Sequence, residues 1–168
     1  FSRFAQRLIT VLQTTTREGI VYRIDTRLRP SGRSGPLVSS LDGFRRYHES
    51  SAQVWERQAL IKARPLTGAT ALADAVAAIV AAFVYRAPLT PDEAHEIRRL
   101  RQRMEQELAR ESHERINIKT GRGGLVDVEF LTQMLQLAYG VHEPRLRVRS
   151  TFDALQVLRE IHVLSDDD

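Results

Sequence analysis

The chain has 168 residues, of which 42% are hydrophobic and 27% are charged, and it contains no cysteine. This length allows one or two domains with a buried core, and the composition excludes wholesale disorder. Without cysteine there are no disulfides or thiolate metal ligands, and the longest apolar run, 75–84, is too short to span a membrane. We therefore expect a cytoplasmic protein without a membrane partner.

The net charge is +4, and all but two of the 25 basic residues are arginines; the lysines are Lys62 and Lys119. The planar guanidinium group suits phosphate and carboxylate partners, so the excess of arginine favours an anionic ligand. The alternative is that most of these arginines simply cover the solvent-exposed faces of helices.

The first predicted elements are a helix and a hairpin. Apolar residues in 1–12 have helical spacing, and because no cap precedes them we expect the chain to begin inside a longer polypeptide. Residues 19–29 alternate between apolar and polar, which predicts a strand that ends at Pro30. A turn-rich stretch, 30–35, would join it to a short strand at 36–39. Two strands do not make an independent sheet, so we expect further strands upstream.

The rest of the chain has helical periodicity. Ser40 is a suitable N-cap for the first predicted helix, and Thr90, followed by Pro91, is suitable for the third. The second predicted helix is so rich in alanine and valine that we expect it to be deeply packed. The predicted helices cover residues 40–64, 69–85, 90–112, 125–139 and 150–161. The fold class is therefore α+β and mostly helical.

Asp25 is the first candidate functional residue. It lies on the polar face of the predicted strand, where Arg27 and Arg29 follow at alternate positions. Mg²⁺ prefers carboxylates and phosphate oxygens, arginines bind phosphates, and Gly32 would let backbone amides approach an anion. The alternative is that Asp25 is only a salt-bridge partner of these arginines.

A glycine-rich segment, 119–130 (KTGRGGLVDVEF), supplies the second group of candidates. Gly123 and Gly124 directly precede a predicted helix, whose N-terminus would favour an anion, and Lys119 and Arg122 would add positive charge. The spacing is not that of a Walker motif. Asp127 and Glu129 are two residues apart, about 200° around a helix, so we expect one to face the site and the other to brace the structure. The alternative is a flexible turn before an ordinary helix.

Residues 55–64 (WERQALIKAR) form a third segment, in which Glu56, Lys62 and Arg64 are candidates. A solvated helix face with paired charges is the alternative. The five histidines have no ligand spacing, and we expect no role for them.

These segments, together with 23–39 (RIDTRLRPSGRSGPLVS), resemble in order and spacing the signature of glutamine synthetase adenylyltransferases. That family lies in the DNA polymerase beta-like nucleotidyltransferase superfamily. The resemblance implies a palm in which three carboxylates hold two Mg²⁺ ions and the triphosphate of ATP. Asp25 matches the third carboxylate and is therefore the expected catalytic and metal-binding residue. The Gly-Ser-Asp-X-Asp motif that carries the other two is absent from this sequence, so we expect it upstream and expect this chain alone to be inactive.

The resemblance also implies a domain organisation and partners. Residues 1–66 would be the C-terminal part of a partial palm, a β-hairpin plus a helix, and 67–168 would be a helical domain resembling a bundle. The activity would be adenylylation of a tyrosine of glutamine synthetase, or removal of the adenylyl group. Glutamine synthetase would be the protein substrate and a PII nitrogen-signalling protein the regulator. The residues expected at the nucleotide are Arg27, Arg29, Gly32, Arg64, Lys119, Arg122, Gly123, Gly124, Asp127 and Glu129.

Two other functions remain as alternatives. An arginine-rich helical module could bind nucleic acid through counterion release. Acidic residues are interleaved with the arginines of 92–115 and no known recognition motif is present, so we expect no nucleic-acid partner. The second alternative is a non-catalytic docking domain formed by the helical segment 69–168.

Overall fold

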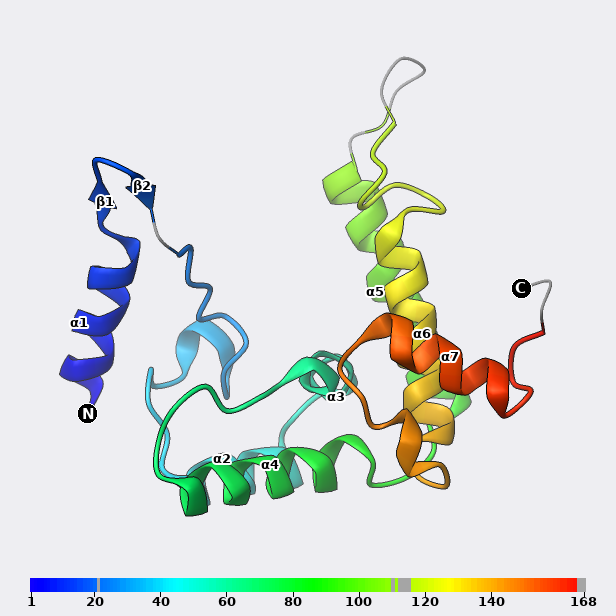
Figure 1. Ribbon diagram of the computed structural model, residues 1–168, viewed down its shortest axis with the longest axis horizontal. Helices are drawn as coiled ribbons and strands as arrows, with labels where there is room; N and C mark the ends of the chain where they lie inside the picture. Colours follow the sequence, from blue (N-terminus) through cyan, green and yellow to red (C-terminus); the bar gives the residue numbers. More distant parts are fainter. Residues whose placement is uncertain (21, 110, 112–115, 166–168) are drawn as a thin grey trace. The chain divides into compact units, whose positions relative to one another are not determined.

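The computed structural model describes residues 1–20, 22–109, 111 and 116–165 (Figure 1). The chain divides into two compact units, Phe1–Ala52 and Gln53–Asp168, which are treated separately below. Among the described residues there are seven α-helices and one small antiparallel hairpin. The prediction of a mostly helical α+β chain is thereby confirmed.

The first unit begins with helix α1 (Ser2–Gln13), none of whose residues is buried. The hairpin follows, with β1 (Thr15–Thr16) paired to β2 (Gly19–Ile20). A short 3₁₀ turn, η1 (Gly32–Ser34), precedes helix α2 (Leu41–Ser50). As predicted, Ser40 caps α2, because its Oγ accepts a hydrogen bond from the Gly43 amide at 3.1 Å.

The predicted strand over 19–29 is wrong beyond its first two residues. Residues 22–29 have irregular backbone, 36–39 form no strand, and the hairpin is closed by the turn at 17–18 instead. Alternation gives a segment an apolar and a polar face, but a strand also needs a neighbour to accept and donate its backbone hydrogen bonds. Within the described part of the chain, no second strand pairs with 22–29.

The predicted single helix over 40–64 is also wrong. Helix α2 ends at Ser50, and a separate helix, α3 (Val54–Ala59), continues into the 3₁₀ turn η2 (Leu60–Lys62). The break arises because the Gln53 amide donates to Glu56 Oε2 at 2.8 Å, which starts a new helix. The boundary between the two compact units lies at this break.

The second unit is a set of packed helices in which α3 contacts α4, α5 and α6, and α6 contacts α7 (Figure 1). The elements after η2 are α4 (Thr70–Val84), α5 (Pro91–Met104), the π-helical turn η3 (Glu105–Ala109), α6 (Leu125–Tyr139), the 3₁₀ turn η4 (Pro144–Leu146) and α7 (Thr151–Glu160). The predicted helices at 69–85, 125–139 and 150–161 are confirmed. The start of the third at Thr90 is confirmed, while its predicted end at 112 lies outside the described residues.

The hydrophobic core belongs to the second unit. Its buried apolar residues are Val54, Ile61, Ile79, Phe83, Val84, Ile97, Ala109, Val126, Leu137, Leu146, Ala154 and Leu158. Helix α4 is less deeply packed than predicted, because only residues of its C-terminal half are buried and Leu72 is half exposed. None of the helices in the described residues has the length and apolar character required to cross a bilayer.

Candidate functional site

In the first unit, Asp25 is held by Arg27. The Arg27 amide donates to Asp25 Oδ1 at 2.9 Å, and its guanidinium Nη2 lies 2.5 Å from Oδ2. These hydrogen bonds lower the pKa of Asp25 from 3.8 to about 2, so the side chain is a carboxylate at neutral pH. More than half of each side chain is exposed, and the pair is therefore open to a ligand.

Arg29 organises the turn that follows. Its Nη1 donates to the carbonyl of Thr26 at 2.5 Å, and its Nη2 donates to the carbonyl of Gly35 at 3.3 Å. Gly32 has a φ of 53°, a left-handed conformation that favours glycine, and its amide donates to the Arg29 carbonyl at 2.7 Å. A shallow depression here is lined by Arg23, Ile24, Asp25, Thr26, Arg27, Arg29 and Arg33. Four arginines against one carboxylate give it a positive charge that suits an anion.

The described residues do not by themselves form a magnesium site. Asp25 is a single carboxylate and both of its oxygens are engaged by Arg27. No group of three or more histidine, aspartate or glutamate side chains in the described part of the chain is placed to hold a metal ion. Mg²⁺ binding to proteins uses carboxylates together with substrate phosphates and water, and one paired carboxylate is not sufficient.

In the second unit, the glycine loop (residues 117–124) is held by Asn117. The Asn117 Oδ1 atom accepts hydrogen bonds from the amides of Lys119 and Thr120 at 3.1 and 3.0 Å. Its Nδ2 donates to the carbonyl of Ala109 at 3.2 Å, which ties the loop to the end of η3. Asn117 therefore fixes the first half of the loop.

Arg101 and Asp127 hold the second half of the glycine loop. Arg101 Nη2 donates to the Gly121 carbonyl at 2.8 Å, and its Nε lies 2.6 Å from Asp127 Oδ1. The Gly123 amide donates to the other oxygen of Asp127, Oδ2, at 2.6 Å. Arg101 is buried, and its Nε and Nη1 atoms make ion pairs with Asp127 and Glu105 without the alignment of hydrogen bonds. Sequence reasoning missed Arg101, although its position four residues after the core residue Ile97 indicates the same buried helix face.

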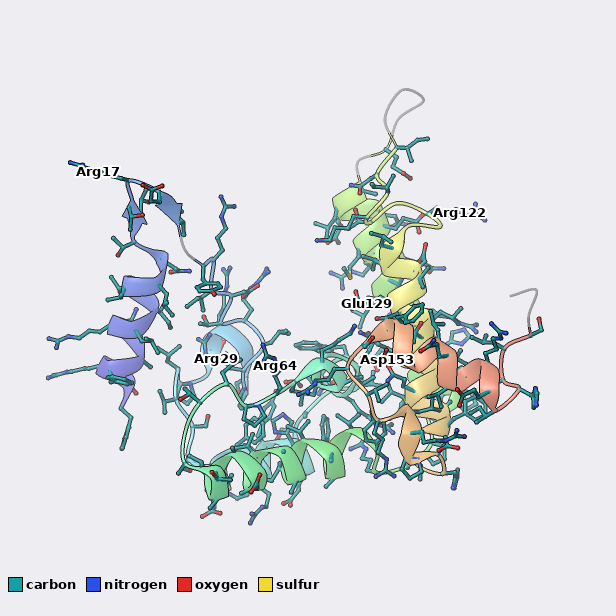
Figure 2. The ribbon with its side chains drawn as sticks, in the orientation of Figure 1. Arg17, Arg29, Arg64, Arg122, Glu129 and Asp153 are labelled. Carbon is teal, nitrogen blue, oxygen red and sulfur yellow. The ribbon has the colours of Figure 1, made fainter. Side chains whose placement is uncertain are left out.

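The predicted anion site at the start of α6 has fewer free amides than the sequence suggests. The amides of Leu125 and Val126 donate to the carbonyls of Ile118 and Lys119, both at 3.0 Å. Backbone donors at this helix end are thus occupied within the loop, whereas the side chains of Lys119 and Arg122 are exposed. Figure 2 shows Arg122 projecting from the loop. Any anion here would meet these two side chains first.

Asp127 and Glu129 have different partners, in agreement with their predicted separation around the helix. Glu129 Oε1 lies 3.1 Å from Lys62 Nζ, which also donates to Thr151 Oγ1 at 2.8 Å. This contact joins η2, α6 and the start of α7. Arg64, two residues beyond Lys62, is exposed (Figure 2).

The structure thus places the candidates in two groups. Asp25, Arg27, Arg29 and Gly32 belong to the first unit. The second unit contains the others, which are Arg64, Lys119, Arg122, Gly123, Gly124, Asp127 and Glu129. Of these, Asp127 is joined to Gly123 by a hydrogen bond, while Glu129 makes an ion pair with Lys62.

Comparison with known proteins gives two family matches. Residues 1–79 match the family model of glutamate-ammonia ligase adenylyltransferase, and residues 93–168 match that of GlnD PII-uridylyltransferase. Two curated proteins named bifunctional glutamine synthetase adenylyltransferase/adenylyl-removing enzyme are similar over 161 residues, or 96% of this chain. The protein from Shewanella woodyi is 41% identical and that from Shewanella loihica is 40% identical. The chain spans 17% of the length of each of these relatives.

Proposed function

Since this chain belongs by sequence to the glutamine synthetase adenylyltransferase family, we propose that it acts as part of a nucleotidyltransferase that modifies glutamine synthetase. The two family models that match its halves both describe nucleotidyl transfer to a protein, which supports this function. Because the chain is about a sixth of the length of its relatives, it supplies only part of a catalytic unit.

The observation that carries the proposal is the exposed Asp25 carboxylate beside Arg27 and Arg29. A carboxylate with a pKa of about 2 stays ionised throughout the physiological range, as a metal ligand must. The surrounding guanidinium groups suit the phosphates of a nucleotide. In the whole enzyme, Asp25 would be one of several carboxylates that bind Mg²⁺, which would neutralise charge on the phosphates of ATP.

The reaction proposed is transfer of an adenylyl group. In the forward direction, a tyrosine oxygen of glutamine synthetase forms a bond to the α-phosphorus of ATP while the bond to the departing pyrophosphate breaks. In the removal reaction, an oxygen of inorganic phosphate forms a bond to the adenylyl phosphorus while the bond from that phosphorus to the tyrosine oxygen breaks, which releases ADP and restores the tyrosine hydroxyl. The proposed part of the first unit is to balance the phosphate charge through Arg27 and Arg29.

Glutamine synthetase is the proposed protein substrate, and a PII signalling protein the proposed regulator. We place the enzyme in the cytoplasm, where ATP and glutamine synthetase are found, and assign no role to nucleic acid or a membrane. Without further carboxylates, the 168-residue chain alone should have no measurable turnover.

Substitution of Asp25 tests the proposal in the longer enzyme that contains this sequence. The Asp25→Ala variant should lose at least about a hundredfold in adenylyl transfer, because it removes a carboxylate that would bind the Mg²⁺ neutralising the phosphates. Transfer is measured with radiolabelled ATP and purified glutamine synthetase. Asp42→Ala, which removes an exposed carboxylate from α2, is the matched control and should retain full activity. Near-normal transfer by the Asp25 variant would contradict the assignment.

A further inference from the structure

The glycine loop is an ordered part of the second unit. Gly121 is buried, and a Cβ atom added to it would lie 2.6 Å from the Asn117 carbonyl oxygen. Gly124 is also buried, and a Cβ there would lie 2.8 Å from the carbonyl oxygen of Ile118. The backbone is therefore packed more closely than any residue with a side chain would permit.

The buried carbonyl of Gly121 accepts two hydrogen bonds, one from the Gly124 amide within the loop at 3.1 Å and one from Arg101 of helix α5 at 2.8 Å. The same guanidinium lies against Asp127, which accepts the Gly123 amide. One side chain thus fixes both sides of Arg122, directly at Gly121 and through Asp127 at Gly123. The Arg122 side chain itself remains exposed.

We propose that Arg101 is a positioning residue, which holds the glycine loop so that the side chains of Lys119 and Arg122 meet the phosphates of the nucleotide. This inference rests on the proposed function, and it adds that the loop binds phosphate through side-chain charge on a rigid backbone. The amides of Leu125 and Val126, already bonded within the loop, are not the main donors. Ordering these groups before the ligand arrives lowers the entropy lost on binding.

Arginine is required at position 101 for a geometric reason. Its planar fork lets Nη2 donate to the Gly121 carbonyl while Nε makes an ion pair with Asp127, whereas lysine carries the same charge at a single point. Arg101→Lys therefore keeps the net charge and removes the double contact. Asp127→Asn, at a partly exposed position, weakens the same connection with less risk to the fold.

The test measures binding of tripolyphosphate to the 168-residue chain by calorimetry and exchange of the Gly123 amide by nuclear magnetic resonance. Arg122→Gln should weaken binding roughly tenfold, as expected for the loss of one charge-assisted hydrogen bond. Arg101→Lys and Asp127→Asn should weaken it to a similar extent and accelerate Gly123 exchange, while exchange of the core residue Leu137 stays unchanged. Arg98→Gln, which removes an exposed charge from the same helix, is the matched control and should bind within about twofold of the unmodified chain.

Several results would overturn the proposal. They are wild-type affinity in Arg101→Lys, an equal loss in Arg98→Gln, unchanged Gly123 exchange in both loop variants, and no binding of tripolyphosphate by the unmodified chain. If Arg101→Lys also exposes Leu137 to exchange, Asp127→Asn decides the question. Because the readout is phosphate binding in the second unit, a failed Asp25 transfer assay would contradict the proposed function without changing this result.

Discussion

At the scale of single residues, the Asp25–Arg27 pair controls the charge of the first candidate site. The hydrogen bonds from Arg27 favour the ionised form of Asp25 and reciprocally raise the pKa of Arg27. A carboxyl group with a depressed pKa remains paired above that pKa and loses the pairing as the pH falls through it. The pair should therefore persist at pH 3.8, where an aspartate with the ordinary pKa is half protonated.

This charge state can be measured directly. Titration of the Asp25 carboxyl carbon by nuclear magnetic resonance should give a midpoint at about pH 2 in the unmodified chain. In Arg27→Gln the midpoint should rise towards 3.8, because the main stabilising donor is removed. Arg33→Gln, which contributes only at longer range, should change it much less. Equal midpoints in the unmodified chain and Arg27→Gln would contradict the pairing.

Arg57 is the second residue whose environment leads to a prediction. It is fully buried, its Nε donates to the Val84 carbonyl at 2.8 Å, and its Nη1 contacts Glu93 at 3.2 Å. Nη2 donates to the carbonyl of Ala87. Burial lowers the pKa of Arg57, and the charge of Glu93 opposes that shift. Burial would raise the pKa of Glu93, but its bond from the Thr90 amide and the charge of Arg57 outweigh it.

Removing Arg57 should therefore be costly. Arg57→Leu leaves the carbonyls of Val84 and Ala87 without this donor and removes one partner of Glu93, and should lower the free energy of unfolding by about 3–5 kcal/mol. Arg86 contacts the same Glu93 from an exposed position, so Arg86→Leu should cost under about 1 kcal/mol. Urea denaturation followed by fluorescence of Trp55 measures both. Similar losses of unfolding free energy in the two variants would show that burial of the arginine does not determine how much its contact with Glu93 stabilises the fold.

At the scale of elements, the helices of the second unit follow from local signals in the sequence. The Thr90 hydroxyl accepts the Glu93 amide at 3.2 Å, and the Glu93 carboxylate accepts the Thr90 amide at 3.0 Å, as the sequence pattern predicted. The irregular backbone of 22–29 was not predictable from its alternation, because a strand forms only where a neighbouring strand pairs with it, and no such strand is present among the described residues. The contact of Arg101 with the glycine loop could not be predicted from local sequence either, since its acceptor is the backbone carbonyl of Gly121, 20 residues further along the chain.

The glycine loop provides a test at this scale. Gly121→Ala would place a Cβ 2.1 Å from Glu111 Oε1 and 2.6 Å from the Asn117 carbonyl, and should cost about 3 kcal/mol of stability. Gly123 has a φ of 72° but open space around it, so Gly123→Ala should cost only about 1 kcal/mol of backbone strain. Urea denaturation of the two variants gives both values. A larger loss at Gly123 would contradict the packing described for the loop.

At the scale of the whole molecule, the two units differ in how much of their surface they bury. His48 is the single buried residue among the described residues of Phe1–Ala52, whereas all the buried apolar residues of the described chain belong to the second unit. Helix α1 exposes Phe4 and Val11 to about 70% each. Asp25, the candidate metal ligand, therefore lies in a unit without buried apolar residues among those described, and the sheet predicted from the alternation of 19–29 does not form there.

This difference predicts how the units behave apart. A chain of residues 53–168 should be helical by circular dichroism and unfold cooperatively in urea, because its core is internal. Residues 1–52 alone should show neither property, since a piece of this size without buried apolar side chains gains too little on folding. A sharp unfolding transition in 1–52 would refute this.

The buried arginine at position 57 also has a consequence for exchanging the C-terminal part of the chain. It lies within the region that matches the adenylyltransferase family, while Glu93 opens the region that matches the uridylyltransferase family. Val84 and Ala87, whose carbonyls it binds, fall in the short stretch between the two matches. A chimera that replaces the C-terminal part of the chain should leave the buried guanidinium of Arg57 without its carboxylate partner, unless the replacement also has an acidic residue at position 93.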